Sequence, residues 1–149
     1  MSEPVELVAS SPEETEAAAE RLGRSLGGGD VVLLYGDLGA GKTAFVRGLA
    51  RGLGAPPEEV SSPTFTLIQE YAGGRATLYH VDLYRLEPNE VDDLGLDELA
   101  ASGVVAVEWA DRWSDRPGRA IEVRLEHEGD DSRRVFIREG SEAAARPDD

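Results

Sequence analysis

The segment with the clearest chemistry is GDLGAGKT, which runs from Gly36 to Thr43. Its spacing, G-x-x-x-x-G-K-T, is that of a phosphate-binding P-loop. Glycines let backbone N–H groups turn toward an anion, and the N-terminus of a following helix adds the positive end of its dipole. In such a loop the lysine contacts the outer phosphates and the threonine hydroxyl binds Mg²⁺. The pattern therefore predicts a nucleotide site, with an ordinary glycine-rich turn as the simpler alternative.

Both flanks of the segment favour the nucleotide site. The run at 31–35 is wholly apolar, as expected of a strand buried on both faces. Apolar residues recur at helical spacing from Phe45 to Leu53. The nucleotide-binding residues that we expect here are Gly36, Asp37, Leu38, Gly39, Ala40, Gly41, Lys42, Thr43 and Ala44.

Lys42 is the only lysine among the 15 lysine and arginine residues of the chain. A GC-rich genome would exchange dispensable lysines for arginine, but an ammonium also fits between phosphate oxygens as a planar guanidinium does not. We expect Lys42 to lie in a solvent-facing loop and to neutralise phosphate charge. Guanine selectivity in Ras-like GTPases uses an Asn/Thr-Lys-x-Asp element, which needs a lysine of its own. ATP is therefore a better candidate than GTP.

A Mg²⁺ site beside a P-loop takes a second anchor, usually a carboxylate at the end of a neighbouring buried strand. Glu108 follows the apolar run 104–107 and fits this position. A strand-end carboxylate in solvent is the alternative. In combination with the P-loop, Glu108 is our candidate for a Mg²⁺ ligand beside Thr43.

Two further segments carry polar side chains, SPTFTL at 62–67 and HVDLYRL at 80–86. In an extended strand, His80, Asp82 and Tyr84 would share one face, and the apolar residues between them the other. The same alternation is typical of a strand that is exposed on one side. Composition alone leaves both interpretations open.

The hydrophobic pattern predicts the elements that position these residues. We expect helices over 12–26 and 44–53, short helical turns within 89–101, and strands over 5–8, 31–35, 65–71, 76–84, 104–107, 121–126 and 135–137. Gly73-Gly74 predicts a hairpin turn between the third and fourth of these strands. The predicted fold is an α/β, P-loop NTPase-like three-layer domain, with a mixed β-sheet flanked by helices. We expect one domain over 1–139 and a disordered acidic tail over 140–149.

Length and composition indicate one globular domain. The chain has 149 residues, of which 40% are hydrophobic, and its lack of cysteine excludes disulfides, thiolate metal sites and a cysteine nucleophile. No stretch is apolar enough for a membrane span or a signal-peptide core, so we expect a cytoplasmic protein with no membrane partner. The net charge of −15 argues against direct nucleic-acid binding and favours a basic protein partner.

Four segments, GDLGAGKT, SPTFTLIQEY, HVDLYRL and VVAVEW, resemble the bacterial TsaE family in their order and spacing. The resemblance covers nearly the whole chain up to the final hairpin. It implies a P-loop ATPase that acts with TsaB, TsaC and TsaD in making threonylcarbamoyladenosine beside the anticodon of tRNA. It further implies that the chain hydrolyses ATP–Mg²⁺ to ADP in complex with TsaD–TsaB, its protein partners, and meets tRNA only indirectly.

The resemblance also implies a catalytic set and a metal site. It places Asp82 near the γ-phosphate, where this carboxylate could orient or activate the attacking water. Lys42 and Glu108 complete the expected catalytic residues. Thr43 and Glu108 are the expected Mg²⁺ ligands.

Other residues take their expected roles from the resemblance alone. Thr15 matches a position that touches the base end of the nucleotide. Thr64 and Thr66 lie in what resembles a switch-like loop. Trp109 follows the acidic residue as in the family, either near the nucleotide or as a reporter on the partner. Ala44 is a departure, because a second small polar residue is common there.

Two other functions are compatible with a P-loop. One is a small-molecule kinase, although 149 residues leave little room for an acceptor pocket and an arginine-bearing lid. The other is a non-catalytic regulator, in which nucleotide binding alone controls TsaD–TsaB. The combination of Asp82 with Glu108 favours hydrolysis.

Overall fold

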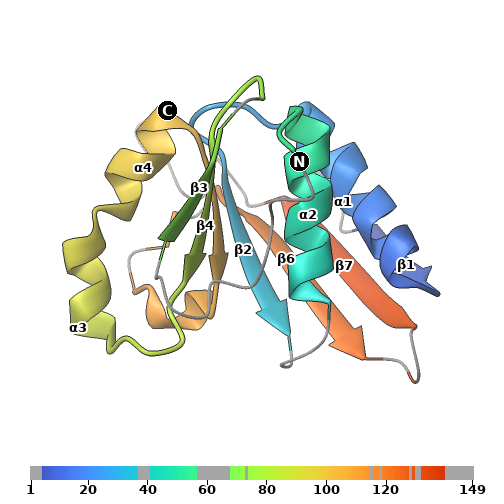
Figure 1. The fold of residues 1–149 in the computed structure, drawn as a ribbon. Helices are drawn as coiled ribbons and strands as arrows, with labels where there is room; N and C mark the ends of the chain where they lie inside the picture. Colours follow the sequence, from blue (N-terminus) through green and yellow to red (C-terminus); the bar gives the residue numbers. More distant parts are fainter. Residues whose placement is uncertain are drawn as a thin grey trace.

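A seven-stranded mixed β-sheet lies between two layers of helices (Figure 1). This computed structural model describes residues 5–36, 41–56, 68–72, 74–114, 116–117, 119–127, 129 and 132–139. The strands are β1 (Val5–Ala9), β2 (Val31–Gly36), β3 (Ile68–Tyr71), β4 (Leu78–Asp82), β5 (Val104–Glu108), β6 (Ile121–His127) and β7 (Arg133–Glu139). The helices are α1 (Pro12–Ser25), α2 (Lys42–Leu53), α3 (Pro88–Val91) and α4 (Leu96–Ser102), with the 3₁₀ turns η2 (Asp92–Leu94) and η3 (Ala110–Arg112). The predicted α/β three-layer fold is confirmed.

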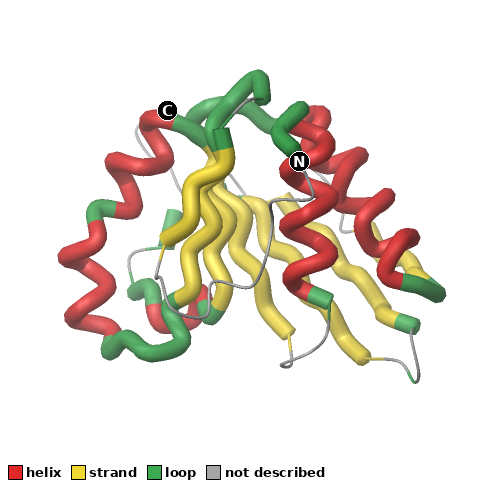
Figure 2. The backbone as a smooth tube through the Cα atoms, viewed as in Figure 1, coloured by secondary structure: helices red, strands yellow, loops and turns green. Residues whose placement is uncertain are grey.

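The strand order, β1-β7-β6-β2-β5-β4-β3, places β2 in the middle of the sheet. β2 pairs in parallel with β5 and β6, and β5 pairs in parallel with β4. Because these strands share one direction, which the arrows of Figure 1 show, the carboxyl ends of β2, β5 and β4 meet at the same edge. Figure 2 draws the same sheet in yellow, with helices in red on both sides. Glu108 lies at that edge, paired with Leu34 on one side and with Asp82 on the other.

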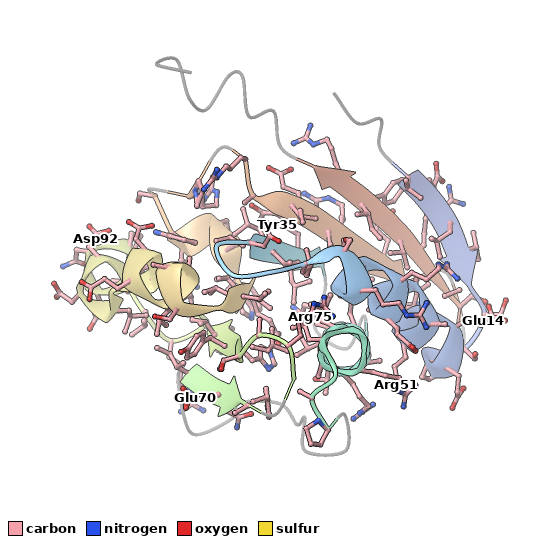
Figure 3. The ribbon with its side chains drawn as sticks, turned by 90° about the horizontal axis from the view of Figure 1, so that it is seen from above. Glu14, Tyr35, Arg51, Glu70, Arg75 and Asp92 are labelled. Atoms are coloured by element: carbon pink, nitrogen blue, oxygen red, sulfur yellow. The ribbon has the colours of Figure 1, made fainter. Side chains whose placement is uncertain are left out.

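Alternate residues of β2 pack into two separate hydrophobic cores. Val32 and Leu34 pack with Phe45 of α2, in the core that α1 and α2 cover. Val31 and Leu33 pack on the other face with residues of α3, α4 and η3. Figure 3, seen from above, shows these two helical layers on opposite sides of the sheet. Burial on both faces explains why β2 is wholly apolar in sequence.

Helices α1 and α2 approach each other closely at glycines. A Cβ atom on Gly48 would lie 2.2 Å from the carbonyl oxygen of Glu16, and one on Gly52 would lie 2.4 Å from that of Glu20. No side chain fits at these distances, so glycine sets the separation of the two helices.

Arg75, in the connection from β3 to β4, joins the hairpin to the ends of this helix pair (Figure 3). Its guanidinium donates to the carbonyl oxygens of Gly23 at 2.8 Å, Leu26 at 2.7 Å and Gly52 at 3.2 Å. The last carbonyls of a helix lack partners within the helix. One arginine therefore caps the C-terminal ends of both α1 and α2.

Strand β4 is buried on both faces, which differs from the one-sided exposure that its sequence pattern also allowed. Its polar and apolar residues alternate as predicted, but His80 and Val81 are both fully buried. Leu78 packs in the core beneath α1 and α2, and Val81 packs in the core on the other face. Because helices cover both faces of β4, a strand exposed on one side is the wrong description.

Some predicted features fall outside the described residues. These are the segment 57–67, which includes Thr64 and Thr66, together with Gly73 and the tail 140–149. Among the helices that the structure describes, none combines the length and the apolar character needed to cross a bilayer.

Candidate functional site

The predicted P-loop begins and ends in glycines whose backbone requires glycine. Gly36, the last residue of β2, has a φ of +146°, and a Cβ atom there would lie 2.3 Å from the carbonyl oxygen of Leu125. Gly41 precedes α2 with a left-handed φ of +96°. The described flanks, a strand that ends at Gly36 and a helix that begins at Lys42, are those that a P-loop requires. The predicted residues Asp37, Leu38, Gly39 and Ala40 lie outside the described part of the chain.

Lys42 is the first residue of α2 and is only 6% exposed, so the expected solvent-facing loop position is wrong. Its Nζ donates to the carbonyl oxygen of Gly36 at 3.2 Å. The same atom lies 4.0 Å from Oε1 of Glu108 and 5.0 Å from the centre of the Trp109 ring. The ammonium is thus enclosed by a carbonyl, a carboxylate and an aromatic face.

Glu108 is also buried, with 6% of its surface exposed. Its Oε2 accepts a hydrogen bond from Nε2 of His80 at 2.5 Å, while its Oε1 faces Lys42. This excludes the alternative of a strand-end carboxylate in solvent. Buried charges occur where partners stabilise them, and Glu108 has one partner for each oxygen.

Asp82 is paired with Glu108 in the sheet and is half-buried. Its Oδ1 accepts a hydrogen bond from the backbone N–H of Tyr84 at 2.9 Å. Burial raises the pKa of Asp82 above its ordinary value, and the neighbouring charge of Glu108 raises it further. The Tyr84 hydrogen bond, His80 and Lys42 act in the opposite direction.

Trp109 has an unusual backbone conformation next to Glu108. It is the one residue other than glycine, among those described, with a positive φ, at +60°. That conformation is strained for a bulky residue and is often found at functional sites. It directs the Trp109 ring against Lys42 and against Tyr84, whose ring centre lies 4.9 Å away.

Thr15 of α1 lies beside the start of α2. It is buried, and its Cγ2 would be 4.0 Å from a Cβ atom on Gly41. Thr43 and Ala44 follow in the first turn of α2 and are partly exposed. The structure therefore brings Thr15, the loop end and the first turn of α2 together.

A pocket of about 370 Å³ opens beside Lys42. It is lined by Leu34, Tyr35, Gly36, Lys42, Trp109, Asp111 and Arg124. The Arg124 guanidinium lies 5.3 Å from the centre of the Tyr35 ring. The sequence did not indicate three of these lining residues, Tyr35, Asp111 and Arg124. Of the three, only Tyr35 had a local signal, its position directly before Gly36.

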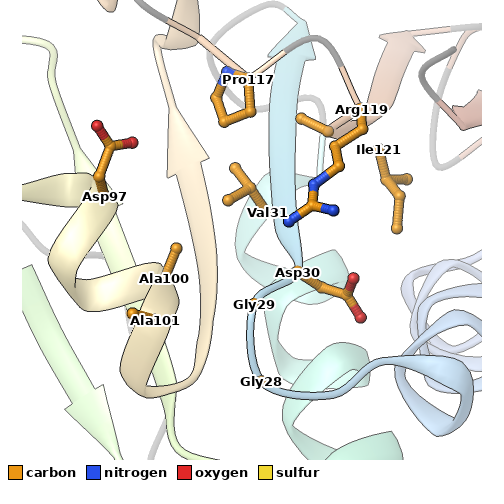
Figure 4. A pocket seen from close by; sticks show the side chains of 11 residues that line it. Gly28, Gly29, Asp30, Val31, Asp97, Ala100, Ala101, Pro117, Arg119 and Ile121 are labelled. Atoms are coloured by element: carbon orange, nitrogen blue, oxygen red, sulfur yellow. The ribbon is translucent and has the colours of Figure 1, made fainter. Parts of the chain in front are cut away.

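A larger cavity, of about 570 Å³, lies at the opposite end of β2 (Figure 4). Asp30 and Arg119 lie on one side of it, and Asp97 of α4 lies across from them. Lys42 and Glu108 are at the other edge of the sheet. In open α/β sheets ligands bind beyond the carboxyl ends of the strands, so the smaller pocket marks the candidate site.

The residues at this site fit a magnesium ion that is carried by phosphates. Among the described residues, no group of three or more His, Asp or Glu side chains could hold a metal by itself. Mg²⁺ in nucleotide sites commonly uses one or two protein ligands and completes its shell with phosphates and water. Glu108, at the end of the strand next to β2, could provide such a carboxylate.

Comparison with known proteins identifies the family. The sequence profile described as "Threonylcarbamoyl adenosine biosynthesis protein TsaE" matches residues 9–135. The chain belongs to the TsaE family. The matched range includes Lys42, Asp82 and Glu108, and the resemblance drawn from the four sequence segments is confirmed.

Members of the TsaE family from distant bacteria are similar over most of the chain. Three proteins carry the name "tRNA threonylcarbamoyladenosine biosynthesis protein TsaE". The protein from Nostoc is 49% identical, over 78% of this chain and 74% of its own. Those from Bacillus subtilis and Aquifex aeolicus are 46% and 41% identical, over 84% and 89% of this chain and 79% and 94% of their own. The crystal structure of Bacillus subtilis YdiB matches with a TM-score of 0.78 at 37% identity, over 95% of this chain and 88% of that one.

Proposed function

We propose that this protein is an accessory ATPase of tRNA threonylcarbamoyladenosine biosynthesis, which binds ATP–Mg²⁺ and hydrolyses it in complex with TsaD–TsaB. The observation that carries the proposal is the 4.0 Å contact between Lys42, at the start of α2, and Glu108, at the end of β5. In P-loop sites a lysine binds phosphate and a strand-end carboxylate binds the metal, so this contact brings together the two residues that we propose for these tasks. The names of the relatives support the pathway.

Lys42 would bind the outer phosphates of ATP. Within the described part of the chain, its ammonium donates to the carbonyl oxygen of Gly36 and has a longer contact with Glu108. A phosphate oxygen would provide a stronger, charge-assisted partner. Thr15, next to Gly41, lies on the side where the base end of the nucleotide is proposed to bind.

Thr43 and Glu108 would hold the magnesium ion, which supplies positive charge that offsets the charge of the phosphates. Glu108 is suited to this task because Lys42 and His80 keep its carboxylate in place. The burial of Glu108 limits the access of water to that carboxylate.

Asp82 would act on the attacking water. It lies beside Glu108 at the same edge, and its raised pKa makes it a stronger proton acceptor than an ordinary aspartate. Its Oδ1 accepts a hydrogen bond from the Tyr84 N–H, and its Oδ2 is the oxygen that we propose for the attacking water.

The test is phosphate release from ATP by the purified chain, with Mg²⁺ or with EDTA. We expect slow release that requires Mg²⁺ and that Lys42→Ala abolishes. Transfer of phosphate to a metabolite would instead establish a small-molecule kinase. ATP binding with no hydrolysis, even with TsaD–TsaB present, would establish a non-catalytic regulator.

A further inference from the structure

We propose that His80 is a positioning residue, which orients the Glu108 carboxylate for the magnesium–nucleotide complex. This inference rests on the proposed function. His80 is completely buried, and its Nε2 lies 2.5 Å from Oε2 of Glu108. An ionised carboxylate only accepts hydrogen bonds, so Nε2 carries the hydrogen and donates it.

The two oxygens of Glu108 have separate partners. Oε2 is occupied by His80, and Oε1 faces the ammonium of Lys42 at 4.0 Å. Rotation of the carboxylate would break the short bond to His80. The histidine therefore keeps Oε1 directed toward the P-loop, where the phosphates and their cation are proposed to bind.

The register of strands β4 and β5 places His80 within reach of Glu108. His80 is paired with Ala106, two residues before Glu108 on the same face of the sheet. The imidazole reaches diagonally across the two strands, a distance that long side chains can span. Asp82 occupies the position directly opposite Glu108, so His80 supplies a donor where the neighbouring strand would otherwise present only another carboxylate.

Packing alone does not account for a histidine at this position. His80 lies two residues after Leu78, on the same face of β4, and Leu78 packs in the core that α1 and α2 cover. A polar group buried there is costly unless it is hydrogen-bonded. Nδ1 of His80 has no hydrogen-bond partner among the described residues, so the bond to Glu108 is the one that compensates its burial. An aliphatic side chain of similar size could fill this space, but it would leave Oε2 of Glu108 without this donor. Residues that hold a metal ligand from behind commonly tune metal affinity in this way.

The test measures how Mg²⁺ tightens the binding of a fluorescent ADP analogue to the full chain. In His80→Leu, the Mg²⁺ concentration for half-maximal tightening should rise by about 10- to 100-fold, the usual effect of removing such a supporting residue. The affinity measured in EDTA should stay unchanged, because His80 contacts no phosphate-binding group. His80→Gln should retain most of the Mg²⁺ response, since its amide can place an N–H near the position of Nε2. Leu78→Met is the matched control on the same strand and face, and should leave both affinities unchanged.

A purely structural role for His80 predicts a different result. His80→Leu would then lower the melting temperature and weaken ADP binding equally with Mg²⁺ and in EDTA, while the Mg²⁺ concentration for half-maximal tightening stayed the same. That outcome would overturn the proposal. If His80→Leu does not fold, His80→Asn replaces it, because its shorter amide reaches the position of Nδ1 and cannot reach Glu108. Equal Mg²⁺ responses of the Asn and Gln variants would also refute the inference. If Mg²⁺ does not change the affinity of the wild-type chain for the ADP analogue, the proposed function itself is refuted.

Discussion

At the scale of single residues, the structure explains why one lysine stands among so many arginines. The ammonium of Lys42 lies in a buried space bounded by the carbonyl oxygen of Gly36, the carboxylate of Glu108 and the ring of Trp109. A planar guanidinium on a longer stem has a different shape and needs more donors satisfied. The shape of this space therefore favours lysine, in addition to the phosphate binding that we propose for it.

We expect Lys42→Arg to weaken ATP binding nearly as much as Lys42→Ala. Loss of one charged hydrogen bond costs about 1.5–3 kcal/mol, which corresponds to roughly a 10- to 100-fold rise in the dissociation constant. Titration calorimetry of ATP with Mg²⁺ measures this, with circular dichroism to show that each variant is folded. Arg51→Lys on the exposed part of α2 is the control exchange. Normal binding by Lys42→Arg would refute our explanation of the lone lysine.

Asp82→Asn should separate ATP binding from hydrolysis. Asparagine keeps an oxygen that can accept from the Tyr84 N–H, but it removes the charge and the basicity. ATP binding should persist, while hydrolysis should slow by about 100- to 10,000-fold, the usual contribution of a general base. Single-turnover hydrolysis with TsaD–TsaB present gives the rate. Equal rates for wild type and variant would leave Asp82 a structural residue of β4.

The raised pKa of Asp82 also predicts a pH dependence of stability. Its carboxyl binds a proton more tightly in the folded chain than in the unfolded one, where its pKa is near 3.8. Its contribution is therefore fully present below that value and is lost as the pH rises through the folded pKa. Asp82→Asn should be more stable than wild type near neutral pH, and the difference should vanish in acid. Urea unfolding at about pH 7 and about pH 3 tests this, and a less stable Asn variant at neutral pH would contradict it.

At the scale of elements, sequence patterns predicted the buried strands β2 and β5, the helix that follows the glycine-rich segment, and the place of Glu108 at a strand end, because these depend on local spacing. The contacts of His80 and Thr15 join segments that are distant in the sequence. His80 follows a polar–apolar alternation that also describes an exposed strand, and only the packing of helices on both faces shows that it is buried. Thr15 meets Gly41 because α1 packs against α2, which no spacing in the sequence specifies.

The close contact of α1 and α2 yields a stability prediction. In Gly48→Ala the new methyl group would lie 2.2 Å from the carbonyl oxygen of Glu16, so α1 must move. Such overpacking costs about 1–3 kcal/mol of unfolding free energy, although alanine is the better helix former. Gly28→Ala, where nothing lies within 4 Å, is the control and should change stability little. Urea denaturation compares the two, and equal stabilities would show that the helices can separate without cost.

At the scale of the whole molecule, the net charge favours a protein partner over a nucleic-acid partner. The net charge of −15 repels a phosphate backbone, whose binding usually needs clustered lysine and arginine. We expect the purified chain to show no tRNA affinity at physiological salt. Electrophoretic mobility shift with unmodified tRNA tests this, and tight binding that survives added salt would show that the chain contacts tRNA directly.

The central claim is that the cluster of Lys42, Glu108 and Asp82 hydrolyses ATP in support of TsaD–TsaB. The most direct measurement is the steady-state rate of ATP hydrolysis by the wild-type chain, alone and with TsaD–TsaB. We predict a slow rate alone and a clear increase with the partners, with both rates lost in Glu108→Ala. A rate that the partners leave unchanged, or one that Glu108→Ala retains, would contradict this account.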